Sequence, residues 1–266
     1  MKIYLSVDIE GVTGVTHWDE TEKNKGDYSP FMEQMTKETK AACDGAINAG
    51  AKEIIIKDAH DSGRNINHND LPQCTKLIRG WSGHPFSMVQ DIDNTYDAAM
   101  FIGYHSCSHS DKNPLSHTMH PFSINYIKIN GVYASEFLLH AYAAAYVGVP
   151  VVMVSGDEGL SEEVKIINSN IHTVSVKQGI GASTVSIHPE VAIDKIKKQA
   201  EVSLSNIKEC KIKLPEKFIV EISYVNHVKA YRSSFYPGMK RISETEVVFE
   251  TKDYLSVMSM IQFLVS

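Results

Sequence analysis

Two carboxylates, Asp8 and Glu10, directly follow a short hydrophobic segment, residues 2–7, at the start of the chain. In an extended backbone, residues two apart point to the same side, so both carboxylates can face one point. His60 lies just beyond a second apolar segment, residues 53–57. Carboxylate oxygen and imidazole nitrogen are both common metal ligands, so these positions are candidates for a metal site.

His105 ends a third apolar segment, residues 98–104. If the three segments are neighbouring parallel strands, their carboxyl ends converge on a single cleft. The donors include no thiolate, which suits zinc or another divalent ion, and more than one carboxylate suits two ions that share a bridging aspartate. Taken singly, each residue has an ordinary alternative, such as a hydrogen-bonded loop histidine or a carboxylate that caps a helix.

Glu136 and His140 lie four residues apart in a predicted helix over 134–147, so they share one helix face. The rest of this helix is small and apolar, so Glu136 is expected to be buried and to need a partner, which a metal would supply. His140 is more typical of a satisfied core histidine. His117 and His120 lie in the preceding loop, where a histidine could act on a tetrahedral intermediate or simply face solvent.

Apolar strand patterns alternate with helical patterns along the chain. We predict strands at 2–7, 53–57, 98–104, 149–155, 171–176, 217–225 and 245–251, a hairpin around Asn130-Gly131 within 123–135, and helices at about 29–50, 134–147, 157–168, 188–207 and 253–264. The first helix is expected to take Ser29 as its cap, with Pro30 at its first position, and to stop at Gly50.

This alternation predicts an α/β fold, with a mostly parallel sheet flanked by helices and a smaller C-terminal α/β lobe. Residues 1–207 would form the metal-binding catalytic region, and residues 208–266 a strand-strand-helix lobe. A single domain is the alternative.

The composition excludes several classes of function. A net charge of −6 gives no reason to expect a nucleic-acid partner, because phosphate binding needs a clustered basic surface. The four cysteines are scattered without a C-x-x-C pair, which argues against a zinc ribbon or a disulfide framework. No apolar run approaches the roughly 20 residues that span a bilayer, and the N-terminus does not resemble a signal peptide. We therefore expect a cytoplasmic protein without a membrane partner.

Several motifs together resemble the DppA-type D-aminopeptidases, a family of zinc-dependent, self-compartmentalising peptidases. The resemblance covers nearly the whole chain, and its motifs are "SVDIEG" (6–11), "DAH" (58–60), "GYHS" (103–106), "SHTM" (116–119), a glutamate early in the helix after the "NG" turn, "PFSMVQDID" (85–93), "VPVVMVSGDE" (149–158), "VKQ" (176–178) and "PGM" (237–239). The loop around Cys107, His109 and Lys112 and the stretch 226–236 depart from the pattern.

The resemblance implies two zinc ions per subunit, with other divalent ions possible. The implied ligands are Asp8, which bridges both ions, Glu10 and His60 on one ion, and His105 and Glu136 on the other. His117 would be the catalytic histidine, and Gly11 would let the chain turn sharply behind the ligands, where a larger side chain would crowd the site. The subunits would form a homo-oligomer, a decamer of two stacked five-membered rings.

The predicted reaction is hydrolysis of short peptides with an N-terminal D-amino acid, such as D-alanyl dipeptides, by a metal-activated water with His117 assisting. An amidase, a deacylase or an L-peptide aminopeptidase on the same site remains an alternative. A phosphoesterase would need basic residues beside the metals, of which the motifs hold few. A non-catalytic peptide-binding protein is the alternative from another class.

Overall fold

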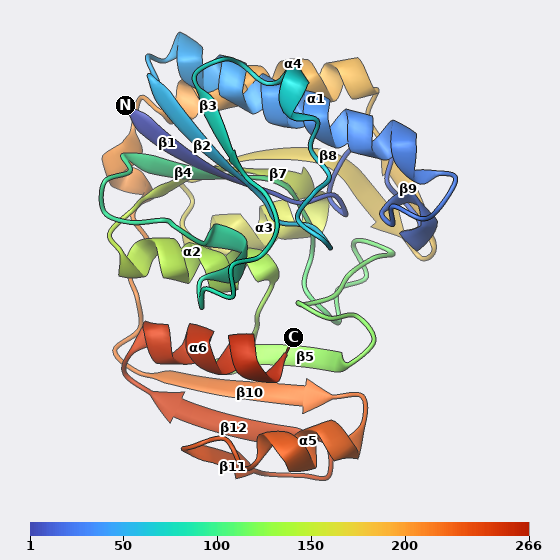
Figure 1. The fold of residues 1–266 in the computed structure, drawn as a ribbon, viewed down its shortest axis with the longest axis vertical. Helices are drawn as coiled ribbons and strands as arrows, with labels where there is room; N and C mark the ends of the chain where they lie inside the picture. The colour runs from blue at the N-terminus through green and yellow to red at the C-terminus, as the bar shows by residue number, and fades with distance from the viewer. Residues whose placement is uncertain (266) are drawn as a thin grey trace.

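The computed structural model describes residues 1–265, which form layers around two β-sheets (Figure 1). The larger sheet has the strand order β3-β2-β1-β4-β7-β8-β9. Its strands are β1 (Lys2–Val7), β2 (Glu53–Asp58), β3 (Thr75–Ile78), β4 (Ala98–Tyr104), β7 (Val151–Asp157), β8 (His172–Ile180) and β9 (Ser183–Ser186). Only β9 is antiparallel to its neighbour. The predicted α/β fold with a mostly parallel sheet is confirmed.

Helices cover both faces of the larger sheet. The α-helices are α1 (Tyr28–Asn48), α2 (Glu136–Tyr146), α3 (Glu158–Ile167), α4 (Pro189–Ser203), α5 (His227–Ser233) and α6 (Tyr254–Leu264), and the short 3-10 helices are η1 (Trp18–Glu20), η2 (His68–Asp70), η3 (Ser87–Val89) and η4 (Ile207–Cys210). α1 and α4 pack together on one face, and α2 and α3 lie on the other (Figure 1). Within residues 1–265, no helix is both long and apolar enough to cross a membrane.

Helix α1 begins earlier than predicted. Its N-cap is Asp27 rather than Ser29, and Pro30 is the third helical residue instead of the first. The amides of the first helical turn have no partner within the helix, so proline is tolerated at this position too. The predicted stop at Gly50 is confirmed, since its φ of +95° is a left-handed conformation that favours glycine.

The second sheet is antiparallel and has the order β11-β12-β10-β5-β6. Its strands are β5 (Ile124–Ile129), β6 (Val132–Tyr133), β10 (Phe218–Tyr224), β11 (Met239–Arg241) and β12 (Glu246–Thr251). β5 and β6 form the predicted hairpin, and Asn130 and Gly131 both have the positive φ that such a turn needs. The sheet therefore includes a hairpin from the predicted catalytic region. The division into domains at residue 208 stays a prediction.

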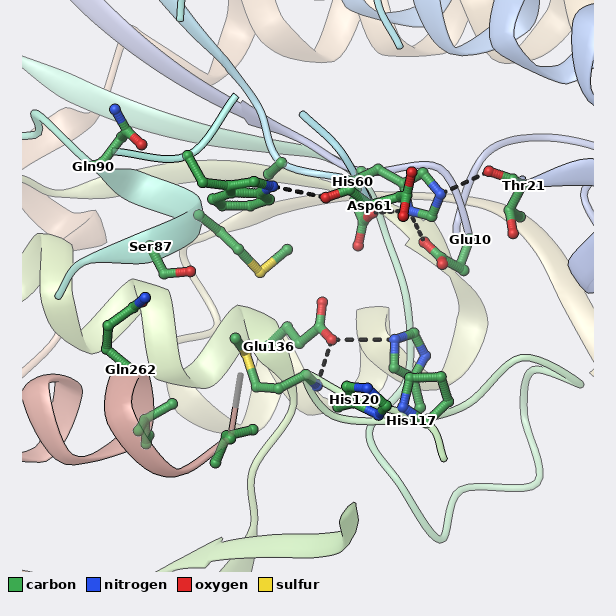
Figure 2. A pocket seen from close by; sticks show the side chains of 18 of the residues that line it. Glu10, Thr21, His60, Asp61, Ser87, Gln90, His117, His120, Glu136 and Gln262 are labelled. Atoms are coloured by element: carbon green, nitrogen blue, oxygen red, sulfur yellow. Dashed lines mark hydrogen bonds and ion pairs between the residues drawn. The ribbon is translucent and has the colours of Figure 1, made fainter. Parts of the chain in front are cut away.

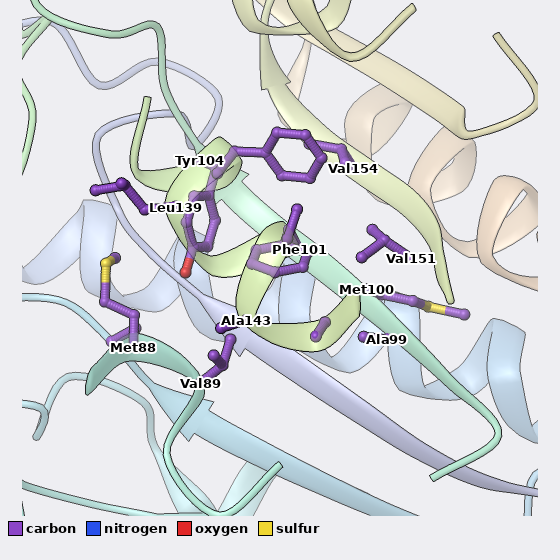
Figure 3. Close-up of a cluster of buried hydrophobic side chains, with 14 of the residues drawn as sticks. Met88, Val89, Ala99, Met100, Phe101, Tyr104, Leu139, Ala143, Val151 and Val154 are labelled. Carbon is purple, nitrogen blue, oxygen red and sulfur yellow. The ribbon is translucent and has the colours of Figure 1, made fainter. Parts of the chain in front are cut away.

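The central strands β1, β2, β4 and β7 are buried along nearly their whole length, as expected for a sheet covered on both faces. On the α2 face, Phe101 and Tyr104 of β4 lie among Leu139 and Ala143 of α2 (Figure 3). The ring of Phe101 also meets that of Phe137 edge-on, with centroids 5.2 Å apart. Close packing of α2 against β4 holds the start of this helix beside the carboxyl ends of the strands.

Candidate metal centre

The three strand ends that carry the predicted ligands are adjacent in the larger sheet. β1 lies between β2 and β4, with parallel register on both sides. Asp8 and Glu10 therefore leave the sheet next to His60 on one side and His105 on the other. The expectation that these strands are neighbours is confirmed, and their polar ends form one cleft.

Asp8, Glu10 and His60 make up the first of two ligand groups. Nδ1 of His60 lies 3.3 Å from Asp8 Oδ1 and 3.2 Å from Glu10 Oε2. The other ring nitrogen of His60, Nε2, donates a hydrogen bond of 2.8 Å to the carbonyl oxygen of Thr21 (Figure 2). Because that hydrogen bond fixes the proton of the ring on Nε2, the lone pair of Nδ1 can coordinate a metal.

His105, His117 and Glu136 make up the second group. Nε2 of His105 lies 3.5 Å from Glu136 Oε2, and Nε2 of His117 lies 3.3 Å from Glu136 Oε1. The two rings are stacked with their centroids 4.3 Å apart. Each Nδ1 faces a backbone carbonyl oxygen, that of Ser106 at 2.9 Å and that of Leu115 at 2.8 Å, so both Nε2 atoms point into the site.

Asp8 connects the two groups. Its Oδ1 faces His60 in the first group, while its Oδ2 lies 3.6 Å from Nε2 of His105 in the second. The ligand atoms within each group lie within 4.8 Å of one another, a spacing that one ion can span. A carboxylate that presents one oxygen to each of two such groups has the geometry of a bridging ligand.

Charge is concentrated in this site. Burial, and then repulsion from Glu10, raises the pKa of Asp8 well above its usual range. Burial alone would raise the pKa of Glu136 as well, but attraction to His117 and His105 outweighs it and holds that pKa at about 2. Burial and the neighbouring His105 lower the pKa of His117. Three buried carboxylates so close together repel one another unless cations lie between them.

The donor set fits divalent metal ions. Glu10 Oε2 and His105 Nε2 are buried and make no hydrogen bond, although they lie at ion-pair distance from other members of their groups. A buried polar atom without a hydrogen bond costs free energy that a coordinated ion would restore. Histidine nitrogens and carboxylate oxygens, without thiolates, suit zinc and other borderline divalent ions.

The remaining histidines lie outside the two ligand groups. His140 is fully buried and its Nδ1 donates to the backbone carbonyl of Glu136 over 2.6 Å, so it holds the first turn of α2. His120 lines the pocket described below. His109 stacks against Tyr133 of the second sheet, with the ring centroids 5.2 Å apart.

A pocket of about 540 Å³ opens onto both ligand groups. The residues that line it beyond those groups come from several loops and from α6, and sequence patterns gave no sign of most of them. They are Trp18, Thr21, Glu22, Ala59, Asp61, Trp81, Gly83, His84, Ser87, Met88, Gln90, Met119, His120, Pro121, Phe122, Ile261, Gln262 and Val265. Large apolar side chains beside the candidate metal ligands are typical of a pocket that binds an organic molecule.

Comparison with known proteins fits this geometry. The sequence model of peptidase family M55, described as D-aminopeptidase, matches residues 1–263. The chain belongs to this family. It is 32% identical over 258 residues to the D-aminopeptidase of Bacillus subtilis (strain 168), covering 96% of this chain and 93% of that protein. The M55 family is the one that the sequence motifs predicted, and its chemistry makes the chain a metal-dependent hydrolase of peptide bonds.

A solved M55 structure has the same fold. It is the Zn-dependent D-aminopeptidase DppA from Bacillus subtilis, described as a self-compartmentalizing protease. The two structures superpose with a TM-score of 0.93 at 29% sequence identity, covering 99% of this chain and 96% of that one. The superposition includes the second sheet, because it covers nearly all of both chains.

Proposed function

We propose that this M55 protein is a di-zinc aminopeptidase that hydrolyses short peptides with an N-terminal D-amino acid, such as D-alanyl dipeptides. The observation that carries the proposal is the position of Asp8, with one carboxylate oxygen toward His60 and the other toward His105. The names of the relatives, D-aminopeptidase and Zn-dependent, support the choice of metal and of substrate.

Each ion would have three protein ligands. Asp8, Glu10 and His60 would hold one, and Asp8, His105 and Glu136 would hold the other; the same donors also accept other divalent ions. When bound, such a pair supplies a water that is acidic enough to ionise near neutral pH and polarises the scissile carbonyl. The bond broken is the peptide bond next to the free amino terminus.

His117 is the catalytic residue in this proposal. Because both ions would share Asp8, each would already have three protein ligands without His117. Its side chain is also more exposed, at 11%, than those of His105 at 0% and Glu136 at 5%, so substrate can reach it. The hydrogen bond from Nδ1 to the Leu115 carbonyl fixes the ring and keeps a proton on Nδ1, so the lone pair of Nε2 faces the site. A proton that Nε2 takes from the attacking water would then stabilise the developing charge or pass to the leaving amine.

The subunits would assemble into a decamer of two stacked five-membered rings that encloses the active sites, and the protein would be cytoplasmic. Support for the assembly comes from the description of DppA as self-compartmentalizing. Analytical ultracentrifugation tests it directly, because a decamer has ten times the subunit mass of 29.6 kDa. A monomer or dimer at micromolar concentration would contradict it.

The decisive experiment assays dipeptides of both stereochemistries with added zinc, manganese or cobalt. We expect hydrolysis of D-alanyl-D-alanine, no turnover of L-alanyl-L-alanine, loss of activity with a chelator and recovery with zinc. Elemental analysis should find two zinc ions in the parent protein and none in the Asp8→Ala variant. Turnover of L-peptides alone would replace the D-specific proposal with an L-peptide aminopeptidase. Binding without any turnover would favour a peptide-binding protein.

A further inference from the structure

The pocket extends well beyond the two ligand groups, toward α6 and η3. In Figure 2, Ser87, Gln90 and Gln262 lie at the end of the pocket away from His60 and His117. Much of the lining is apolar, and its apolar side chains include Met88, Met119, Phe122, Ile261 and Val265. A substrate group that fills this part of the pocket therefore meets mainly hydrophobic side chains and neutral polar groups.

Phe122 and Trp81 leave much of their apolar surface uncovered, although they line the pocket. Phe122 is 73% exposed and Trp81 is 42% exposed. Exposed aromatic side chains at the mouth of a cavity commonly mark a surface that a ligand covers, because burial of that surface is favourable. An apolar substrate group would gain this burial, whereas a small one such as a methyl group would not.

The charges that line the pocket are one-sided. Among its described lining residues there is no lysine or arginine, and the carboxylates outside the ligand groups are Glu22 and Asp61. A substrate carboxylate in the pocket would find no lysine or arginine to pair with, and the lining side chains outside the ligand groups that can carry a positive charge are the histidines His84 and His120. A substrate ammonium group, in contrast, would be attracted to Glu22 and Asp61.

The positions of these groups set the direction of the substrate. Asp61 follows His60, and Glu22 follows Thr21, whose carbonyl accepts the His60 hydrogen bond, so the backbone brings both residues to the pocket beside the first ligand group. His117, which protonates the leaving amine in the proposed function, lies in the second group. The loop of His117 also supplies Met119 and Phe122 to the pocket wall. The residue after the scissile bond would therefore lie in the apolar part.

We infer, on the basis of the proposed function, that the pocket binds the residue after the scissile bond as an apolar group whose carboxyl end is uncharged. The preferred substrates are then peptide amides and longer peptides with a large apolar second residue. Free dipeptides, including the D-alanyl dipeptides of the proposed function, and peptides with an acidic second residue are cleaved by the same site with a lower kcat/KM.

A matched substrate series tests this inference. The values of kcat/KM are compared for D-alanyl-D-phenylalaninamide, the free acid D-alanyl-D-phenylalanine, D-alanyl-D-glutamic acid amide and D-alanylglycinamide, all with the zinc-loaded enzyme. The phenylalaninamide should exceed each of the other three by about tenfold or more, the scale of selectivity that an apolar pocket provides. Equal or faster cleavage of the free acid or of the glutamyl substrate would overturn the inference.

A pair of variants locates the effect at the pocket. Phe122→Ala should reduce the ratio of kcat/KM for the phenylalaninamide to that for the glycinamide about fivefold or more. Phe263→Ala is the matched control, because Phe263 is 75% exposed, close to the value for Phe122, but does not line the pocket. The control should keep the parental ratio. An unchanged ratio in Phe122→Ala contradicts the placement of the second residue.

A binding measurement separates this inference from the proposed function. Both tryptophans of the chain, Trp18 and Trp81, line the pocket, so intrinsic fluorescence reports its occupation without any turnover. N-acetyl-D-phenylalaninamide should change the fluorescence with an affinity at least about tenfold higher than N-acetyl-D-phenylalanine. If no peptide is cleaved but this preference holds, the proposed function fails and the pocket assignment stands. Equal affinities, or no response to either probe, refute the assignment even when peptides are cleaved.

Discussion

The side-chain amide of Asn113 donates a hydrogen bond of 3.1 Å to the backbone carbonyl of Glu10, and so joins the loop of His117 to the end of β1. The same amide donates to Oδ2 of Asp157 over 2.9 Å. Asp157 also accepts from the backbone amide of Ser106, whose carbonyl orients the ring of His105. One buried carboxylate thus positions segments of both ligand groups.

Asp157→Asn should lower zinc affinity and kcat by about 10- to 100-fold, the usual range for groups that orient metal ligands. An asparagine can still cap α3, but its NH2 group cannot accept the hydrogen bonds from Ser106 and Asn113. The readouts are a competition titration with a zinc chelator and steady-state kinetics.

The matched control for this variant is Asp253→Asn. Asp253 caps α6 through the amide of Ser256 and contacts neither ligand group. The Asp253→Asn variant should keep the zinc affinity of the parent protein. If both variants lose zinc equally, or neither does, Asp157 acts only as a helix cap.

The chain of contacts through Asp157 shows why part of the site could not be predicted. Asp8, Glu10, His60 and His105 could be, because each follows an apolar run long enough to be a buried strand, and parallel strands end at one edge. Asn113 carries no such signal, since its role depends on a residue 44 positions away. Hydrogen bonds between distant segments depend on tertiary structure and are not visible in spacing.

The same limit applies to the fold. The hairpin of β5 and β6 was predictable from Asn130-Gly131, because the turn residues act locally. Its partner was not, because β5 pairs with β10 about 90 residues later. The sequence-based prediction therefore placed this hairpin but did not say which sheet it joins. Strands β3, β9 and β11 and helix α5 were missed because they are short.

His117→Ala distinguishes a catalytic role from a ligand role. If His117 is the catalytic residue, the His117→Ala variant should still bind two zinc ions, and its kcat should be reduced by about 10²- to 10⁴-fold. The competing possibility arises from the 3.3 Å contact between its Nε2 and Glu136 Oε1, which also places it among potential ligands. Loss of one zinc ion by elemental analysis would make His117 a ligand. His109→Ala, at a histidine stacked on Tyr133, is the control and should keep both zinc ions and parental turnover.

Glu163 should make the metal-free protein less stable as the pH rises from about 4.5 to 7. Burial raises the pKa of Glu163 to about 7 from 4.5, despite a hydrogen bond of 2.6 Å from Ser135 Oγ. The folded chain then binds more protons than the unfolded chain between these pH values, so the free energy of unfolding falls across that interval.

The fall attributed to Glu163 should amount to at most about 3 kcal/mol. Glu163→Gln mimics the neutral acid and should remove it, and Glu162→Gln, at the exposed neighbour, should not. Urea unfolding at pH 5 and pH 8 in the presence of a chelator measures the difference. If the free energy of unfolding changes with pH equally in the parent and in Glu163→Gln, Glu163 is not the cause of the change.

Gly11→Ala should damage both stability and metal binding because a larger side chain crowds the site, as the motif suggested, and not because the position needs a left-handed backbone. Gly11 does not have a positive φ. Instead, its backbone amide donates to the carbonyl of Gly103 over 2.8 Å, and a Cβ at position 11 would lie 1.8 Å from the carbonyl oxygen of Tyr104. Nothing flexible can yield there, because the clash is with the backbone of β4 one residue before His105.

The expected cost of Gly11→Ala is about 1–3 kcal/mol or more in the free energy of unfolding, as for other overpacked interiors. Because the strain displaces His105, zinc affinity should fall as well. Gly26→Ala is the control, since a Cβ at position 26 meets no atom within 4 Å. Urea unfolding and zinc titration measure both effects. Parental zinc affinity in a destabilised Gly11→Ala protein would show that the strain is absorbed without moving His105.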